Sequence, residues 1–393
     1  MNGTIYMPVG EVCSSISDTY REKKNMVTLI NTSDVLEGRV LNHERVPNSN
    51  LKGQFKKTFQ RDDILYSEIR PQNRRFAYVD FSPIDYIAST KLMVIRAKKD
   101  VVSPKYLYYF LKNSSTVAEL QLLAETRSGT FPQITFSEVA NLTIPVPSLA
   151  VQEVIVQTMQ CLEDKITCNE QINDNLEQQA QSYFQGLFVD NADPEWAIGT
   201  ISDLGTVVGG STPSKAKPEY YTESGIAWIT PKDLSINKSK FVSHGENDIT
   251  ELGLKNSSAA IMPEGTVLFS SRAPIGYIAI AAGEVTTNQG FKSVVPKPEI
   301  GTPFVYFFLK NTLPVIEGMA SGSTFKEVSG STMKNVPAVI PDAETLAKFS
   351  DFCAPIFAQQ RILEEQNQSL ATLRDNLLPK LMSGEIDVSA VQL

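Results

Sequence analysis

YYFLKN at residues 108–113 returns in the second half of the chain as YFFLKN at residues 306–311. Both copies place aromatic and leucine side chains before a lysine and an asparagine, which is typical of a short amphipathic helix. A single match of six residues could arise by chance. The segments on either side of it therefore decide whether it marks an internal repeat.

Three further blocks repeat in the same order along the chain. They are INTSDV at 30–35 and ITPKDL at 229–234, DILYS at 63–67 and TVLFS at 266–270, and SGTF at 128–131 and GSTF at 322–325. The offset between matching positions varies only between 194 and 203 residues. Four blocks in one order indicate duplication of a whole domain with its appendage, because solenoid repeats are far shorter.

The first part of each repeat is rich in short β-branched and aromatic runs. Examples are YIAST at residues 86–90 and KLMVI at residues 91–95, and Gly, Pro, Asn and Ser separate such runs. This pattern predicts a mixed domain with many strands and few helices.

The second part of each repeat is typical of a long helix. Residues 148–188 contain no proline and a single glycine, and positions 155–187 form a seam spaced alternately four and three residues apart. The seam is mostly apolar, with polar layers at Asn169 and Asn173, and a shift of 194 residues finds it again at 349–381. Matching seams predict that the two helices pack together, with the polar layers fixing their register at a cost in stability. The alternative is that both helices belong to one ordinary globular core.

The charge of the chain is unevenly distributed, although the net charge is −8. Lys and Arg against Asp and Glu number 19 and 15 in residues 1–147, 1 and 8 in 148–194, 12 and 13 in 195–341, and 4 and 8 in 342–393. The acidic excess lies in the two helical segments, and the two larger blocks are basic or nearly neutral. Such blocks can carry a basic face, so the composition permits DNA binding.

Several other classes of function lack their sequence signals. No apolar run approaches the roughly 18 residues of a membrane span, so we expect no membrane association. The four cysteines include no Cys-x-x-Cys pair, which favours a reducing cytoplasm and argues against a disulfide framework or a zinc site. Only two histidines occur, which argues against a metal centre built on histidine. His43 and His244 are expected to be structural or surface residues.

Three segments resemble catalytic motifs without meeting their requirements. GTVVGG at 205–210 lacks the spacing of a dinucleotide-binding loop. KPEYY at 217–221 is not an amino-methyltransferase loop, because Lys217 cannot accept the hydrogen bond that such a loop needs. Asp62, Asp63 and Glu68 are followed by Arg70 and not by the lysine of a nuclease site. The sequence therefore predicts no catalytic constellation.

Cationic and amide side chains in loops are the candidates for DNA contact, since Arg and Lys bind phosphates or guanine and Asn and Gln bind adenine. The candidates in the first half are Lys56, Lys57, Arg70, Asn73, Arg74, Arg75 and Arg127. The candidates in the second half are Ser211, Thr212, Lys215, Lys232, Arg272, Asn288, Gln289, Thr324 and Lys326. Any single one could instead be a solvated surface charge.

The whole chain resembles the specificity subunit of type I restriction–modification systems. The segments that carry the resemblance are NLLPKLMSGEI at 376–386, GIAWITPKD at 225–233, FSSRAPIG at 269–276 and TNQGF at 287–291. The first domain follows the pattern more loosely, with RPQN at 70–73 where the second has APIG at 273–276.

The resemblance implies an α+β fold with an internal pseudo-two-fold repeat, in which two long antiparallel coiled-coil helices separate two mixed α/β target-recognition domains. The expected borders are 1–147 and 190–341 for the recognition domains, and 148–189 and 342–393 for the helical regions. Each recognition domain would read one half of a bipartite, asymmetric site in double-stranded DNA. The helices would set the half-site spacing.

The resemblance also implies partner subunits that carry the chemistry. Two methyltransferase subunits would methylate adenine N6 with S-adenosylmethionine, and motor–endonuclease subunits would use ATP and Mg²⁺. This chain would then be non-catalytic and would hold no cofactor. The alternatives are a stand-alone DNA-binding adaptor without a methylase, a coiled-coil interaction protein without a DNA role, and an enzyme in its own right.

Overall fold

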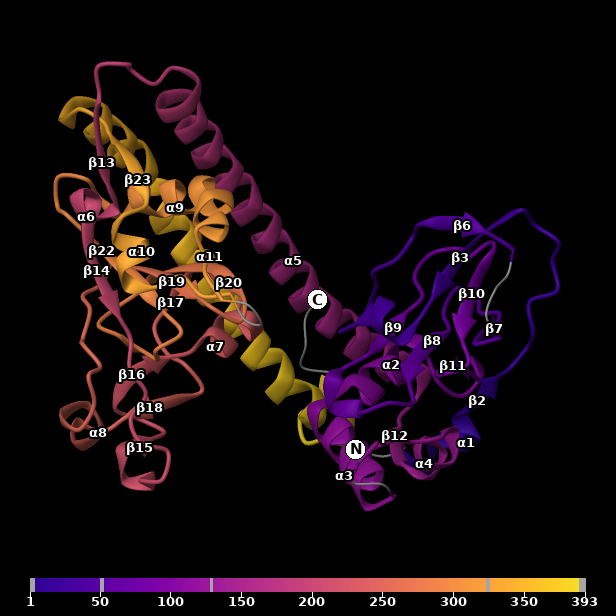
Figure 1. Ribbon diagram of the computed structural model, residues 1–393. Coiled ribbons are helices and arrows are strands. Elements are labelled where there is room, and N and C mark those ends of the chain that lie inside the picture. Colours follow the sequence, from indigo (N-terminus) through magenta and orange to yellow (C-terminus); the bar gives the residue numbers. More distant parts are fainter. Residues whose placement is uncertain (1–3, 50–52, 128–129, 323–325, 389–393) are drawn as a thin grey trace. The chain divides into compact units, whose positions relative to one another are not determined.

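The computed structural model describes residues 4–49, 53–127, 130–322 and 326–388. The chain forms two compact units: unit 1 comprises residues 1–166 and 369–393, and unit 2 comprises residues 167–368. Two long helices, α5 (Leu149–Gln185) and α11 (Ala343–Ser383), each contribute one part to either unit (Figure 1). Helices and strands are mixed throughout, so the predicted α+β class is confirmed. The predicted domain borders stay a prediction, since clustering by contacts divides both helices.

Unit 1 contains twelve strands and four shorter α-helices among its described residues. The strands are β1 (Ile5–Pro8), β2 (Cys13–Ile16), β3 (Met26–Ile30), β4 (Val35–Leu36), β5 (Arg39–Val40), β6 (Arg45–Pro47), β7 (Phe55–Lys57), β8 (Ile64–Ser67), β9 (Phe76–Tyr78), β10 (Tyr86–Ser89), β11 (Leu92–Ala97) and β12 (Thr143–Val146). The helices are α1 (Val9–Val12), α2 (Pro104–Lys112), α3 (Ser114–Arg127) and α4 (Phe136–Asn141). The larger sheets have the orders β2-β11-β8-β9 and β6-β3-β10-β7, and the pairs β1-β12 and β4-β5 stand apart.

Unit 2 contains eleven strands and five shorter α-helices among its described residues. The strands are β13 (Ala197–Thr200), β14 (Gly205–Gly209), β15 (Tyr221–Thr222), β16 (Ile226–Ile229), β17 (Phe241–Val242), β18 (Asn247–Ile249), β19 (Val267–Ser271), β20 (Ile275–Ala281), β21 (Thr286–Thr287), β22 (Lys292–Pro296) and β23 (Pro337–Ile340). The helices are α6 (Ile201–Leu204), α7 (Pro231–Ile236), α8 (Glu251–Lys255), α9 (Thr302–Gly318) and α10 (Gly330–Lys334). The sheets have the orders β14-β22-β19-β20-β17, β15-β18-β16-β21 and β13-β23.

The strand pairing confirms the internal repeat. The order β2-β11-β8-β9 in unit 1 corresponds to β14-β22-β19-β20 in unit 2, and the terminal pair β1-β12 corresponds to β13-β23. The second sheet of each unit contains one parallel pair, β3-β10 and β16-β21, among antiparallel neighbours. A shared and unusual mixture of pair directions is strong evidence for duplication.

The block at residues 30–35 and its copy at 229–234 form the same local structure. In each, a strand ends at a capping residue, Asn31 or Thr230, which begins a short helical turn. The carboxylate of an aspartate three residues later, Asp34 or Asp233, accepts a hydrogen bond from the backbone N–H of the capping residue, at 2.7 Å in both copies. This reciprocal cap stabilises the beginning of a helix and explains why the polar residues of the block repeat.

The segments after β8 and after β19 each place a residue with left-handed backbone before a proline. Arg70 has φ 44° and Ala273 has φ 50°, and each precedes a proline. Left-handed backbone is uncommon for residues other than glycine, so its presence in both copies supports the alignment of the segments at 70–73 and 273–276.

The aromatic blocks form helices, as predicted, and their apolar faces are buried in the two main cores. In unit 1 the block lies at the end of α2, and Asn113 interrupts the helix before α3 begins. In unit 2 the corresponding helix α9 continues to Gly318 and lies against β19, β20 and β22 (Figure 1). Phe304, Phe307 and Leu309 of α9 are almost fully buried. Burial of each such side chain contributes about 1.5–3 kcal/mol.

The predicted seam is confirmed within unit 2, where the end of α5 packs on the beginning of α11. The Nδ2 atom of Asn169 donates to Oδ1 of Asn367 at 2.8 Å, and the Tyr183 and Phe352 rings lie 4.4 Å apart. Rising residue numbers on α5 meet falling numbers on α11, so the two helices run antiparallel here. In unit 1, seam residues from the beginning of α5 share a core with Leu381 of α11.

Within residues 4–49, 53–127, 130–322 and 326–388, no helix is both long and apolar enough to cross a membrane.

Candidate nucleic-acid interface

The loop after β14 approaches the loop after β21 closely in unit 2. The backbone N–H of Ser211 donates to the carbonyl oxygen of Thr287 at 2.9 Å, and the Thr212 hydroxyl binds the side-chain oxygen of Gln289. A Cβ atom at Gly210 would lie 1.9 Å from the carbonyl oxygen of Asn288, so only glycine allows this approach. Four candidates that are far apart in the sequence are therefore neighbours: Ser211, Thr212, Asn288 and Gln289.

Two aromatic side chains hold the same loop in place. The indole N–H of Trp228 donates to the carbonyl oxygen of Ser211 at 3.0 Å, and the Tyr221 hydroxyl donates to that of Pro213 at 2.6 Å. Lys215 is exposed in this loop. A loop fixed by these two donors presents its remaining polar groups in one arrangement, which sequence-specific binding requires.

Cationic side chains surround these two loops. The backbone N–H of Ser271 donates to the carbonyl oxygen of Gly290 at 2.7 Å, which brings the neighbouring Arg272 to the loop after β21. Arg272 lies 3.5 Å from Glu327, and Lys292 lies 3.8 Å from the same carboxylate. The structure thus brings Arg272 to the cluster, together with Lys292 and Glu327, which were not among the predicted residues.

The remaining candidates of the second half lie at the margin of this cluster. Lys326 is exposed beside Glu327. Lys232 is exposed at the beginning of α7 and pairs with Glu246 at 2.5 Å. Thr324 and most of the repeated Ser-Gly-Thr-Phe blocks lie outside the described residues.

The candidates of the first half divide into exposed and internally bonded residues. Lys56, Arg70 and Asn73 are exposed. The ammonium group of Lys57 donates to the carbonyl oxygens of Thr90 and Leu92 at 3.1 and 2.7 Å, and burial lowers its pKa. Lys57 therefore joins β7 to the turn before β11.

The three remaining arginines of unit 1 have protein partners. Arg74 donates to the Ser114 hydroxyl at 2.9 Å, and Arg75 donates to the carbonyl oxygen of Ser33 at 2.9 Å. Arg127 pairs with Glu138 at 2.8 Å and lies apart from these contacts. These bonds fix the loop that begins at Arg70, so the first domain has a less concentrated cluster than the second.

Sequence reasoning also missed Lys91 of unit 1. Its ammonium group lies 3.3 Å from the Glu68 carboxylate and 3.2 Å from the side-chain oxygen of Gln133. Its position before β11 corresponds to that of Gly290 before β22. The carbonyl oxygen of Lys91 accepts from the N–H of Glu68, directly after β8, and that of Gly290 accepts from the N–H of Ser271, the last residue of β19. Only the alignment of the two copies by backbone bonds, and not a local motif, would have identified it.

A partly buried charge cluster joins the second recognition domain to the helices within unit 2. Glu177 of α5 lies 2.8 Å from Lys240 and 2.5 Å from Lys310, and it accepts a hydrogen bond from Tyr306 at 3.1 Å. Burial by itself would raise the pKa of Glu177, but the two ammonium groups outweigh it and lower the pKa to about 2. Burial lowers the pKa of Lys240 to about 8 against the opposing effect of Glu177.

A corresponding joint occurs in unit 1. Lys112, the copy of Lys310, pairs with Glu163 of α5, and Tyr109 donates to the same carboxylate at 2.8 Å. Burial lowers the pKa of Lys112, although Glu163 opposes this effect. The lysine of each aromatic block thus pairs with a glutamate of α5 in both copies, which explains why the repeated motif contains a lysine.

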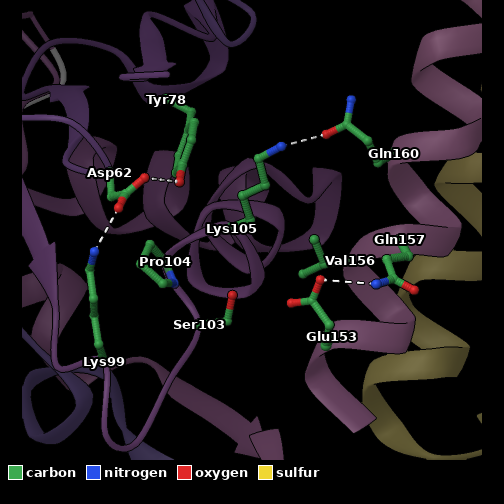
Figure 2. Close-up of a pocket in the computed structure, with 10 residues that line it drawn as sticks. All are labelled: Asp62, Tyr78, Lys99, Ser103, Pro104, Lys105, Glu153, Val156, Gln157 and Gln160. Atoms are coloured by element: carbon green, nitrogen blue, oxygen red, sulfur yellow. Dashed lines mark hydrogen bonds and ion pairs between the residues drawn. The ribbon is translucent and has the colours of Figure 1, made fainter. Parts of the chain in front are cut away.

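Unit 1 contains a surface hollow of about 300 Å³ between the beginning of α5 and the segment before α2 (Figure 2). Its polar groups bond to one another: Asp62 accepts from Lys99 at 2.6 Å and from Tyr78 at 2.8 Å, and Lys105 donates to Gln160 at 2.8 Å. Within the described part of the chain, no cluster of three or more His, Cys, Asp or Glu side chains could hold a metal ion.

Comparison with known proteins gives a consistent result. The family model for the type I restriction modification DNA specificity domain matches residues 6–178 and 194–373. The type I restriction enzyme HindI specificity subunit of Haemophilus influenzae is 29% identical, over 92% of this chain and 94% of that protein. The type I restriction enzyme MjaIX specificity subunit of Methanocaldococcus jannaschii is 41% identical, over 44% of this chain and 41% of that protein.

A solved structure also has a similar fold. The crystal structure of the type I restriction–modification system S subunit from M. genitalium matches with a TM-score of 0.55 at 17% identity. The match covers 97% of this chain and 96% of that chain.

Proposed function

Because the chain belongs to the family of type I restriction–modification DNA specificity proteins, we propose that it recognises DNA sequence for such a complex. The observation that carries this proposal is the duplication of one fold, whose second copy brings polar and cationic loop residues together and whose first copy exposes Lys56, Arg70 and Asn73. Two similar readers in one chain suit a bipartite target. The copies differ in their loop residues, so the two half-sites would differ and the target would be asymmetric.

The candidate side chains suit direct reading of bases. Asn288 and Gln289 carry the amides that bind adenine with two hydrogen bonds, and Arg272 carries the fork that binds guanine. Lys215 and Lys326, both exposed, would bind phosphates and set the position of the domain on the duplex. Exposed Lys56 and Arg70, with Asn73, would have these roles in the first domain.

The chemistry of the complex would belong to partner subunits. Two methyltransferase subunits would bring S-adenosylmethionine, and motor–endonuclease subunits would bring ATP and Mg²⁺. This chain would be a non-catalytic subunit that works in the cytoplasm. Its helices would dock the methyltransferases and set the distance between the half-sites.

The test is co-expression of this chain with its methyltransferase in a host without DNA methylation, followed by single-molecule mapping of N6-methyladenine. We expect a split motif with a methylated adenine in each half, and we expect its loss when this chain is omitted. Absence of new methylation from an assembled complex would contradict the proposal. That result would favour a DNA-binding adaptor that recruits a different protein.

A further inference from the structure

A carboxylate stands among the cations of the candidate interface in unit 2. Glu327 lies 3.5 Å from Arg272 and 3.8 Å from Lys292, and its side chain is 40% exposed. An acidic group at this place repels the DNA backbone and occupies two cations that could otherwise bind phosphates. General attraction between the surface and DNA therefore does not explain this carboxylate.

The backbone fixes the position of this carboxylate. Glu327 and Ser321 exchange two backbone hydrogen bonds of 2.9 and 3.1 Å, and Val328 donates to the carbonyl oxygen of Ser271 at 3.0 Å. Glu327 is thereby held beside Arg272, which follows Ser271 directly. Lys292 is held as well, because its ammonium group donates to the carbonyl oxygen of Gln289 at 3.4 Å.

Unit 1 has an amide at the corresponding place. Ile134 donates to the carbonyl oxygen of Glu68 at 2.9 Å, in the same way that Val328 donates to Ser271. Gln133, which precedes Ile134, therefore corresponds to Glu327. The Gln133 side chain also bonds to a cation, Lys91, but it carries no charge. The two copies thus differ at this position in charge, while both retain a hydrogen-bond acceptor.

We propose that Glu327 is a specificity-determining residue that weakens the binding of the second domain to non-target DNA. Its carboxylate competes with phosphates for Arg272 and Lys292, so contacts with the DNA backbone alone contribute little to the affinity. At the target, base contacts supply the free energy that releases Arg272 from the carboxylate. This inference rests on the proposed function, because it assumes that the cluster faces DNA.

The test compares two duplexes of equal length, one carrying the mapped target and one lacking it, bound to the complex of this chain with its methyltransferase. For Glu327→Gln we expect about tenfold tighter binding to the non-target duplex, since two cations become available to phosphates. Binding to the target should change about twofold or less. The salt dependence of non-target binding should become steeper by about one to two units of slope.

Glu344→Gln is the matched control, because it removes the same charge from an exposed pair with Lys348 at the beginning of α11. It should change neither affinity. The reverse substitution in the first domain, Gln133→Glu, should weaken non-target binding, and it tests the idea even if Glu327→Gln folds poorly. An unchanged or weaker non-target affinity of a folded Glu327→Gln complex would overturn the inference. A wild-type complex that does not distinguish the two duplexes would overturn the proposed function instead.

Discussion

At the scale of single residues, Glu177 of α5 pairs with both Lys240 and Lys310 in unit 2. Its carboxylate compensates the ammonium group of Lys240, whose side chain is only 6% exposed. Glu177→Gln keeps the size of the side chain but leaves a buried cation without its charged partner. We expect the free energy of unfolding to fall by about 3 kcal/mol, measured by urea denaturation.

The control for this substitution is again Glu344→Gln, since an exposed pair on a helix contributes about 0.5 kcal/mol or less. Equal losses for the two variants would show that the partly buried cluster has no special energetic role.

The pH dependence of stability at Glu177 follows from the direction of its pKa shift. Its pKa falls from 4.5 to about 2 on folding, so the folded state favours the charged carboxylate. The contribution is therefore complete above pH 4.5 and is lost as the pH falls through the folded value. The stability advantage of the wild type over Glu177→Gln should shrink by about 3 kcal/mol between pH 5 and pH 2. An advantage that stays constant over this range would contradict the assigned pairing.

At the scale of elements, the polar layers of the helix pair predict a coupling between two asparagines. Asn169 is fully buried and donates to Asn367 at 2.8 Å. Asn169→Leu removes the donor of this bond and should destabilise unit 2 by about 1–2 kcal/mol. The double variant Asn169→Leu/Asn367→Leu should recover this loss, because an apolar layer replaces both polar groups. Urea denaturation of the four proteins gives the coupling energy, and strictly additive effects would contradict the pairing.

The elements also show which features the sequence could predict. The aromatic block repeats because its helix fills the core of each unit and its lysine, Lys112 or Lys310, joins α5. Filling a core and pairing with α5 both require particular residue types at fixed spacing, so these roles leave a pattern that can be recognised in the sequence. The same Lys-Asn pair stands where α2 ends in unit 1 and inside the uninterrupted α9 in unit 2. This pair therefore could not indicate where either helix ends.

For the candidate interface, the sequence predicted which segments carry clusters of polar and cationic residues, but not which of these residues contact one another. The sequence indicated that the segments around residues 211 and 288 are rich in hydrogen-bonding groups, and the structure brings them together. It could not indicate that the carbonyl oxygens of Thr90 and Leu92, where β11 of the other sheet begins, bind Lys57. It also gave no sign that Glu327 lies beside Arg272, because this contact joins residues 55 positions apart.

At the scale of the whole molecule, the duplication predicts that the two domains read DNA independently. Exchange of residues 195–341 for the equivalent segment of another specificity subunit should change one half-site and leave the other unaltered. The physical reason is that the main core of each unit is formed by its own residues. Methylation mapping of the hybrid complex measures the outcome, and a change in both half-sites would contradict the modular interpretation.

The helices predict a second property of the whole molecule, the length of the spacer between half-sites. Seven residues inserted after Ile166 and seven after Gln368 lengthen both helices where the chain passes from one compact unit to the other. A matched heptad retains the seam and adds about 10 Å at 1.5 Å per residue, or about three base pairs of DNA. The mapped motif should therefore keep both half-sites and gain about three spacer positions. Insertion in α5 alone should disrupt the helix pair and abolish methylation, because the seams no longer match. An unchanged spacer in a folded, active double insertion would mean that another part of the complex sets the distance.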